Sequence, residues 1–142
     1  MTACRTLLAF DFGSKKIGIA VGQELTRTAR PLTILRNIGG KPDWAGITRL
    51  IDEWRPDALV VGLPLNMDGT GQDMTRAAKR FANQLQGRYH LPVFQADERL
   101  STRAAQQMIR ERGGAEPREG VDALAAQLIL ETFFGENPPG ET

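Results

Sequence analysis

Three acidic side chains stand where predicted secondary-structure elements end or begin. Asp11 closes the apolar run that starts at Leu7, Glu98 follows a later apolar run, and Asp122 opens an apolar helical segment. If the fold brings these ends together, the acids form a carboxylate cluster that suits Mg²⁺ or Mn²⁺, since these cations prefer hard oxygen ligands. Such cations activate water and stabilise charge on a pentacovalent phosphate, so the pattern indicates phosphodiester chemistry.

Each acid also has a structural explanation. Asp11 precedes a Phe-Gly pair and suits the start of a turn. A buried strand nevertheless gives an acid little reason to be there, which favours a functional role. Asp97 and Glu98 precede a predicted helix, and Asp122 lies in a first helical turn, where the helix dipole stabilises acids. From the residues alone, the pair at 97–98 is explained equally well either way, and Asp122 is better explained as structural.

A turn containing glycine and lysine follows Asp11. Residues 13–16 join two apolar runs over so short a distance that they predict a β-hairpin. Backbone N–H groups and ammonium groups in such a turn can contact a phosphate, which makes Lys15 and Lys16 candidate substrate-binding residues. Because neighbours in an extended chain point to opposite sides, we expect only one of the two lysines to face the site.

Other common active-site chemistries lack the residues they need. His90 is the only histidine and lies far in sequence from Ser14 and Ser101, and Ser101 is better explained as a helix N-cap. Cys4 is the only cysteine, so an internal disulfide and a zinc site of the usual Cys/His type are both excluded. A lone cysteine also favours a reducing compartment, and we expect a cytoplasmic protein.

Composition and charge indicate a globular protein with one core. The chain has 142 residues, of which 41% are hydrophobic and 25% charged, and it contains no apolar run of membrane-spanning length. We expect a single domain over 1–142 with a frayed tail at about 135–142. The net charge is only +1, so any contact with nucleic acid must come from a local basic patch.

The hydrophobic pattern predicts the order β-β-β-α-β-α-β-α-α. Asp43 is a plausible N-cap of the first helix, Pro56 stops that helix, and Gly87 stops the second. Three meandering strands followed by alternating helices and strands give an α/β fold: a mixed five-stranded sheet, antiparallel then parallel, flanked by helices. This is the order of an RNase H-like fold. The predicted strands are 7–11, 17–21, 31–35, 58–63 and 91–94, and the helices are 44–54, 74–85, 101–109 and 121–129.

Four stretches of the chain together resemble one known family, the YqgF/RuvX-type pre-16S rRNA nucleases, which are relatives of Holliday-junction resolvases. In order, the stretches are LLAFDFGSKKIGIAVG, VVGLPLNMDGTG, DERLST and VDALAAQLILE, and they span Leu7 to Glu131. The resemblance implies an RNase H-like fold and a cytoplasmic nuclease that uses Mg²⁺ or Mn²⁺. It further implies a role in trimming the 5′ end of the 16S rRNA precursor during ribosome biogenesis, with RNA or a pre-ribosomal particle as partner.

The resemblance also implies roles for individual residues. The motif acids of the family correspond to Asp11, Glu98 and Asp122, which are then catalytic residues and metal ligands. The DERLST match adds Arg99, which we expect against a phosphate. The loop that begins at Asn66 is expected to shape the substrate groove, although its glycine suits a plain turn equally well.

Three other functions compete with this interpretation. The closest is a nuclease that resolves DNA junctions, which acts as a dimer; Phe133 and Phe134 either contribute a dimer surface or dock a terminal helix on its own core. Another is an RNA- or ribosome-binding module without catalysis, which has no need of a cation. Actin-like ATPases begin with a similar hairpin but need two such domains, and this chain has room for one.

Overall fold

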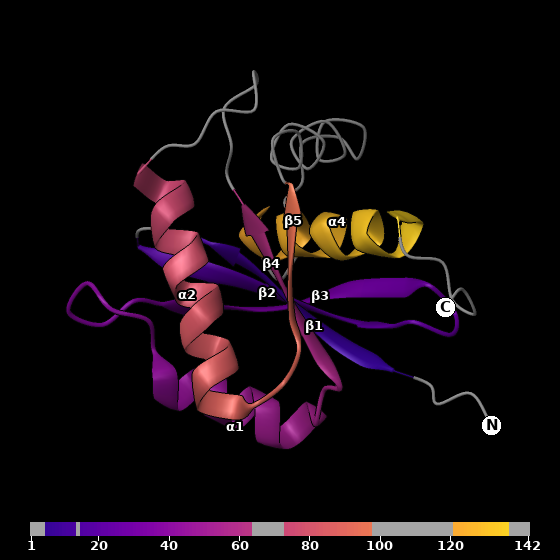
Figure 1. Cartoon of the computed structure of the whole chain (residues 1–142), viewed down its shortest axis with the longest axis horizontal. Coiled ribbons are helices and arrows are strands. Elements are labelled where there is room, and N and C mark those ends of the chain that lie inside the picture. Colours follow the sequence, from indigo (N-terminus) through magenta and orange to yellow (C-terminus); the bar gives the residue numbers. More distant parts are fainter. Residues whose placement is uncertain (1–4, 14, 64–72, 98–120, 137–142) are drawn as a thin grey trace.

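The computed structural model describes residues 5–13, 15–63, 73–97 and 121–136. Within these ranges a five-stranded sheet is flanked by helices on both faces (Figure 1). The strands are β1 (Thr6–Phe12), β2 (Lys16–Gln23), β3 (Thr28–Arg36), β4 (Ala58–Leu63) and β5 (Val93–Asp97), and the helices are α1 (Trp44–Trp54), α2 (Asp73–Tyr89) and α4 (Val121–Glu136).

The sheet is mixed, as the order of elements predicts. Its strand order is β3-β2-β1-β4-β5, with β1 at the centre. The first three strands form an antiparallel meander, while β4 runs parallel to β1 and β5 runs parallel to β4. The carboxyl ends of β1, β4 and β5 therefore meet at one edge of the sheet, the edge at which α/β sheets commonly bind ligands.

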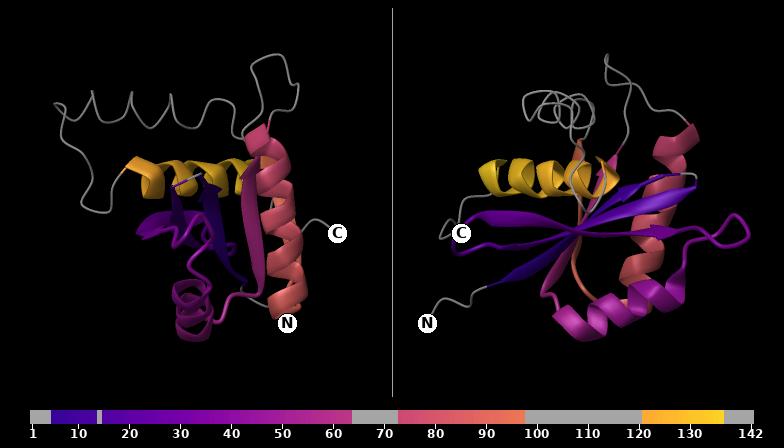
Figure 2. Two further views of the ribbon diagram at one scale, coloured as in Figure 1. Left: turned by 90° about the vertical axis from the view of Figure 1, so that its left-hand side faces the viewer. Right: turned by 180° about the vertical axis from the view of Figure 1, so that it is seen from behind.

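Alternation along β1 divides the apolar residues between two cores. Leu8 and Phe10 face the core that includes α1 and α2, while Leu7 and Ala9 face the core that includes α4. All four side chains are fully buried. Figure 2 shows the resulting layers, with α2 alongside β4 and α4 running across the strands. A strand covered on both faces needs a continuous apolar run, which is what the sequence of β1 supplies.

The core under α4 is built from small strand residues. Ala9, Ala20 and Ala58 lie beneath the helix, and a Cβ added at Gly22 would lie only 2.6 Å from Leu130 Cδ2. The missing side chain at Gly22 therefore lets the helix approach the sheet closely. The side of α4 that meets the sheet consists of Ala126, Ile129, Leu130, Phe133 and Phe134.

The packing of α4 decides the question about its two phenylalanines. Phe133 and Phe134 are 5% and 1% exposed and lie in the core against the sheet. They dock the helix on its own domain, so a dimer surface made of these two rings is ruled out. Ala123, Leu124 and Ala125 are buried as well, so the first turns of α4 are covered on more than one side, as expected for a helix that is apolar all round.

The start of α1 and the end of α2 test two residues that the sequence predicts to bound helices. Asp43 caps α1 as predicted, because its Oδ1 accepts a hydrogen bond from the Gly46 N–H at 3.0 Å. The prediction that Gly87 ends α2 is wrong, since the helix continues to Tyr89. His90 follows with a left-handed φ of 56°, and its N–H donates to the Gln86 carbonyl at 2.9 Å, which closes the last turn.

Four strands differ from their predicted ranges, and β1 and β2 differ only by one or two residues at their ends. The last strand begins at Val93 rather than Leu91 and reaches Asp97, because its backbone pairs with β4 from Leu59 onward. Leu91 instead packs against the core from the preceding connection. The third strand is longer than predicted at both ends. The helix predicted at 101–109 and the tail beyond 136 lie outside the described residues.

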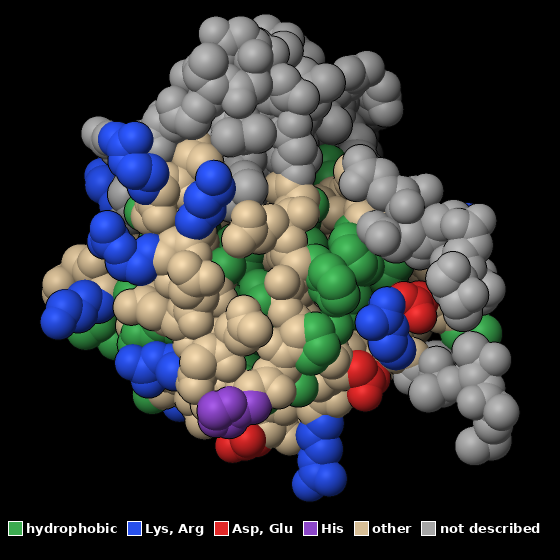
Figure 3. Space-filling model, viewed as in Figure 1, with side chains coloured by type: hydrophobic (Ala, Val, Ile, Leu, Met, Phe, Trp, Pro, Cys, Tyr) green, Lys and Arg blue, Asp and Glu red, His purple; other side chains and the backbone are tan. Residues whose placement is uncertain are grey.

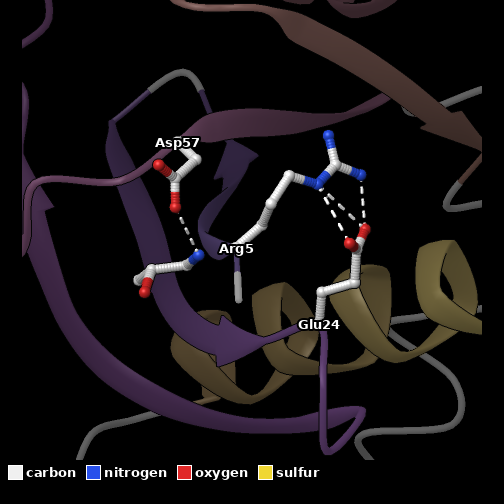
Figure 4. A network of polar contacts seen from close by, with 4 residues as sticks. Arg5, Glu24 and Asp57 are labelled. Atoms are coloured by element: carbon white, nitrogen blue, oxygen red, sulfur yellow. Dashed lines mark hydrogen bonds and ion pairs between the residues drawn. The ribbon is translucent and has the colours of Figure 1, made fainter. Parts of the chain in front are cut away.

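A polar network fixes the start of β1 at the edge opposite Asp11 (Figure 4). The Arg5 guanidinium donates hydrogen bonds to the Glu24 carboxylate at the end of β2, and this hydrogen bonding raises the pKa of Arg5. The Thr6 N–H donates to Asp57 Oδ2 at 2.9 Å, just before β4. These contacts join the three central strands where the sheet begins.

Among the described residues, no helix is long and apolar enough to span a membrane.

Candidate active site at the carboxyl edge of the sheet

Asp11 lies near the end of the central strand, at the edge where the parallel strands end. It pairs with Gly18 of β2, and the preceding residue Phe10 pairs with Val61 of β4. Alternation places Asp11 on the same face as Ala9, which is the face that α4 covers. The side chain is partly buried. An acid in this position is held at the end of a rigid strand rather than on a surface turn.

The residues beside Asp11 on this face have small side chains or none. Gly18 is its cross-strand partner on β2. On β4, Gly62 follows Val61, the partner of Phe10, and Gly62 pairs with Ala96 of β5. Residues at one level of a sheet share a face, so Asp11 carries the only large side chain across these four strands. The sheet itself therefore places no other large side chain next to the carboxylate.

Sequence reasoning missed these small neighbours. Gly18 and Gly62 are two of several glycines within apolar strands. Only the pairing of β1 with its two neighbours shows that both lie beside the end of β1 where Asp11 stands. A glycine inside a strand often marks the close approach of a ligand or another backbone, which was the available signal.

The hairpin predicted after Asp11 is present, and it separates the two lysines. A Cβ at Gly13 would lie 2.6 Å from the Lys16 carbonyl oxygen, so the turn requires glycine there. Lys16 is the first residue of β2 and, two positions before Gly18, lies on the face of Asp11. Lys15 lies in the turn, where its carbonyl accepts a hydrogen bond from the Asn37 N–H at 2.8 Å. Both lysines are exposed.

The other predicted site residues are only partly covered by the structure. Asp122 lies in the first turn of α4, the helix that packs on Asp11's face, but its side chain lies outside the described part. Glu98 and Arg99 follow directly after β5, and Asn66 follows β4; all three lie outside the described residues. Within the ranges that the structure describes, no group of three or more metal-ligating side chains is found. The predicted carboxylate cluster therefore stays a prediction.

One cavity among the described residues lies away from this edge. It has a volume of about 160 Å³ and is lined by the end of β2, the start of β3 and Trp54 of α1. Arg30 stacks over the Trp54 ring there, 5.2 Å from its centroid. Because β2 runs antiparallel to β1, the end of β2 is at the opposite side of the sheet from Asp11, and this cavity has no part in the candidate site.

Comparison of the sequence with known proteins identifies the family. The family described as "RuvX: Holliday junction resolvase" matches residues 5–136. A protein of Haemophilus ducreyi described as "Putative pre-16S rRNA nuclease" is 52% identical over 135 residues, which cover 94% of this chain and 98% of the relative. A protein of Pectobacterium carotovorum with the same description is 54% identical and covers 92% of this chain and 95% of its own length.

Solved structures agree on the fold. The RuvC protein of Thermus thermophilus, in complex with a Holliday-junction substrate, matches with a TM-score of 0.52 at 19% identity, covering 93% of this chain and 94% of that chain. The fowlpox virus resolvase bound to Holliday-junction DNA matches with a TM-score of 0.53 at 9% identity, covering 92% and 97%. At such identities the likeness establishes the RuvC-like, RNase H-like fold alone. Together with the family match over nearly its whole length, it shows that this chain belongs to the RuvX family.

Proposed function

We propose that this chain is a metal-dependent endonuclease that hydrolyses phosphodiester bonds and processes the 5′ end of pre-16S rRNA in the cytoplasm. The observation that carries the proposal is the position of Asp11, at the carboxyl end of the central strand with only small neighbours on its face. Relatives at 52% and 54% identity that are described as pre-16S rRNA nucleases support the choice of substrate.

Three carboxylates are the proposed metal ligands. Asp11, Glu98 and Asp122 offer hard oxygen donors, which suit Mg²⁺ or Mn²⁺ and do not suit softer metals. On the sheet, the neighbours Gly18 and Ala96 carry no polar group, so any further ligands of a cation at Asp11 have to come from outside the sheet, as the proposed Glu98 and Asp122 would. When bound, such a cation supplies Lewis-acid stabilisation of the phosphate and lowers the pKa of a bound water.

Basic and amide side chains are proposed to hold the substrate. Lys16 lies on the face of Asp11 and places an ammonium group near a phosphate bound there. Lys15, Arg99 and Asn66 are proposed to contact the neighbouring phosphates and sugars. Arg99 suits a phosphate because its guanidinium can donate two parallel hydrogen bonds. These contacts orient the scissile bond, and correct orientation alone lowers the barrier by several kcal/mol.

Cleavage of a structured DNA junction is the second candidate. The description of the matched family, a Holliday-junction resolvase, favours it. Junction resolvases need two copies of the active site to cut two strands. Phe133 and Phe134 are buried within this chain and do not supply the required dimer contact. The relatives described as pre-16S rRNA nucleases, at 52% and 54% identity, rank RNA processing first.

The decisive experiment compares both substrates directly. An end-labelled 16S rRNA precursor and a synthetic four-way DNA junction are incubated with the protein after chelation, with Mg²⁺ or Mn²⁺ then added back. Wild type is run beside Asp11→Asn and beside Asp52→Asn, which neutralises an exposed acid on α1. We expect metal-dependent RNA cutting by wild type and Asp52→Asn and none by Asp11→Asn.

The stability of the variant gives a second readout. Two carboxylates about 4 Å apart repel by roughly 4 kcal/mol at an effective dielectric constant of ~20. Without metal, Asp11→Asn relieves such repulsion, so the folded protein should be as stable as wild type or more stable. An unfolded Asp11→Asn protein would contradict the ligand role. Cutting of the junction alone would move the substrate to DNA, and cutting of neither substrate would favour the binding module.

A further inference from the structure

Helix α2 carries a charge that the rest of the chain does not. From Asp73 to Tyr89 it contains four basic residues and one acid, Asp73 at its first position, so its net charge is +3, whereas the whole chain has a net charge of only +1. All other residues together therefore have a net charge of −2. For comparison, the exposed residues of α1 include two acids, Asp52 and Glu53, beside its one arginine, Arg49. Helix α2 is thus a basic element in a chain whose remaining residues are slightly acidic in total.

The basic residues of α2 form a row along its exposed side. Arg76, Arg80, Gln84 and Arg88 follow one another at intervals of four residues, so each neighbours the next in a row that is inclined to the helix axis. We call this row the α2 ridge. All four are exposed, as is Lys79 beside it. At a rise of about 1.5 Å per residue the ridge is about 18 Å long, which spans several nucleotides of a strand.

One end of the ridge is held in place by stacking. The Arg88 guanidinium lies over the Trp44 ring, 4.1 Å from its centroid. Trp44 in turn packs on Phe81 of α2, with ring centroids 5.5 Å apart. A stacked guanidinium keeps its N–H donors available for an anion and loses less conformational entropy on binding.

The ridge leads to the edge of the sheet where Asp11 lies. Tyr89 ends α2 and Val93 starts β5 soon afterwards, so the carboxyl end of α2 is at the edge where the parallel strands begin. The first turns of α2, with Arg76, are therefore at the opposite edge, where those strands end. Figure 1 shows α2 running in this direction alongside β4 and β5. In Figure 3 most of the Lys and Arg side chains in view lie on the side where α2 runs, while others lie beside the acidic ones at the lower and right-hand edges.

We infer that the α2 ridge binds the phosphate backbone of single-stranded RNA and guides the strand to the Asp11 edge. The inference rests on the proposed nuclease function and extends its substrate site to a second face of the sheet, which the motif residues do not include. A row of basic and amide side chains complements a phosphodiester chain. The four residues of the ridge include no aromatic platform, so the contact reads the backbone rather than the bases.

The test measures binding without cleavage. A labelled single-stranded RNA is titrated in EDTA at several salt concentrations, and affinity is followed by fluorescence anisotropy. The ridge variant is Arg80→Gln/Arg88→Gln, which removes two charges from the ridge. The matched control is Arg27→Gln/Arg49→Gln, which removes the same charge from the β2–β3 turn and from α1. For a single strand, removing one phosphate contact reduces the slope of log K against log salt by about 0.7.

We expect the slope of the ridge variant to be smaller by about 1.4 and its binding to be roughly 10- to 30-fold weaker at about 0.1 M salt. The control should stay within about twofold of wild type. Gln84→Lys adds a positive charge within the ridge and should therefore raise both the affinity for RNA and the salt slope. Partial unfolding does not produce such a gain. Equal affinities and slopes for the ridge and control variants would overturn the inference, as would no gain from Gln84→Lys.

The same design separates the inference from the proposed function. Because binding is measured in EDTA, a ridge that binds RNA remains supported even if no cleavage is found. The opposite outcome is also distinguishable. If RNA cleavage depends on Asp11 but the ridge variant binds and cuts RNA like the control, the nuclease function stands and only the ridge inference is overturned.

Discussion

Gly22 tests how closely α4 must approach the sheet. In the variant Gly22→Ala, the new Cβ would lie 2.6 Å from Leu130 Cδ2, 2.8 Å from the Thr28 carbonyl oxygen and 3.1 Å from Phe134 Cε2. A leucine methyl group can move aside. The Thr28 oxygen belongs to the backbone of β3, next to the residue with which Gly22 pairs, and it cannot move without disturbing the sheet.

The size of the effect follows from these contacts. Overpacking a well-filled core costs typically 1–3 kcal/mol, and two contacts below 3.0 Å place this site in the upper part of that range. Replacing glycine restricts the unfolded chain and returns about 0.4–1 kcal/mol. The net destabilisation is about 2 kcal/mol in the free energy of unfolding, or roughly 6–10 °C in Tm for a domain of this size.

Gly87→Ala is the matched control. It makes the same chemical change inside α2, where a Cβ meets nothing within 4 Å. Because alanine favours a helix interior over glycine, this variant should gain about 0.5–1 kcal/mol. Urea and thermal unfolding, followed by circular dichroism, measure both. If Gly22→Ala is as stable as wild type, or if the two variants shift in the same direction, then close packing of α4 does not stabilise this fold in the way these distances indicate.

Two further predictions concern a helix end and the site. Asp43→Ala removes the acceptor of the Gly46 N–H and should lower the free energy of unfolding by about 1 kcal/mol in urea titrations. Asp43→Asn retains an acceptor oxygen and should keep most of the wild-type stability. Lys16→Gln should weaken substrate binding and raise KM more than it lowers kcat, because Lys16 is on Asp11's face and Lys15 is not. Lys15→Gln should change cleavage kinetics less, and equal effects would argue against this assignment.

Patterns that depend on one strand or one helix were predictable from the sequence. The continuous apolar run of β4 predicts its range without error, since such a strand is covered on both faces. Asp43 was predictable as a cap for an equally local reason. The end of α2 was not predictable from Gly87, because packing outweighs the modest cost of glycine in a helix. Tyr89 packs against the core and its hydroxyl lies 2.8 Å from that of Thr48, which holds the last turn in place.

Features that depend on pairing between distant segments were harder to predict. The sequence places Asp11 at the end of a buried strand, and the structure agrees. Its face, and the small neighbours Gly18 and Gly62, follow from register, which no single segment determines. The side of α4 that meets the sheet was equally out of reach. A helix that is apolar all round has no preferred face in its sequence. In the structure, the second half of α4 packs against the sheet through Ile129, Leu130, Phe133 and Phe134.

The position of α4 in the chain has a consequence for how the protein is made. The apolar face formed by Leu7, Ala9 and Ala20 is synthesised early, yet its cover arrives only with residues 121–136. As a chain emerges from the ribosome amino end first, this half of the sheet stays exposed to water and to other chains until α4 docks. A ribosome that stalls before residue 121 would therefore leave an aggregation-prone sheet, and under the proposed function an inactive one.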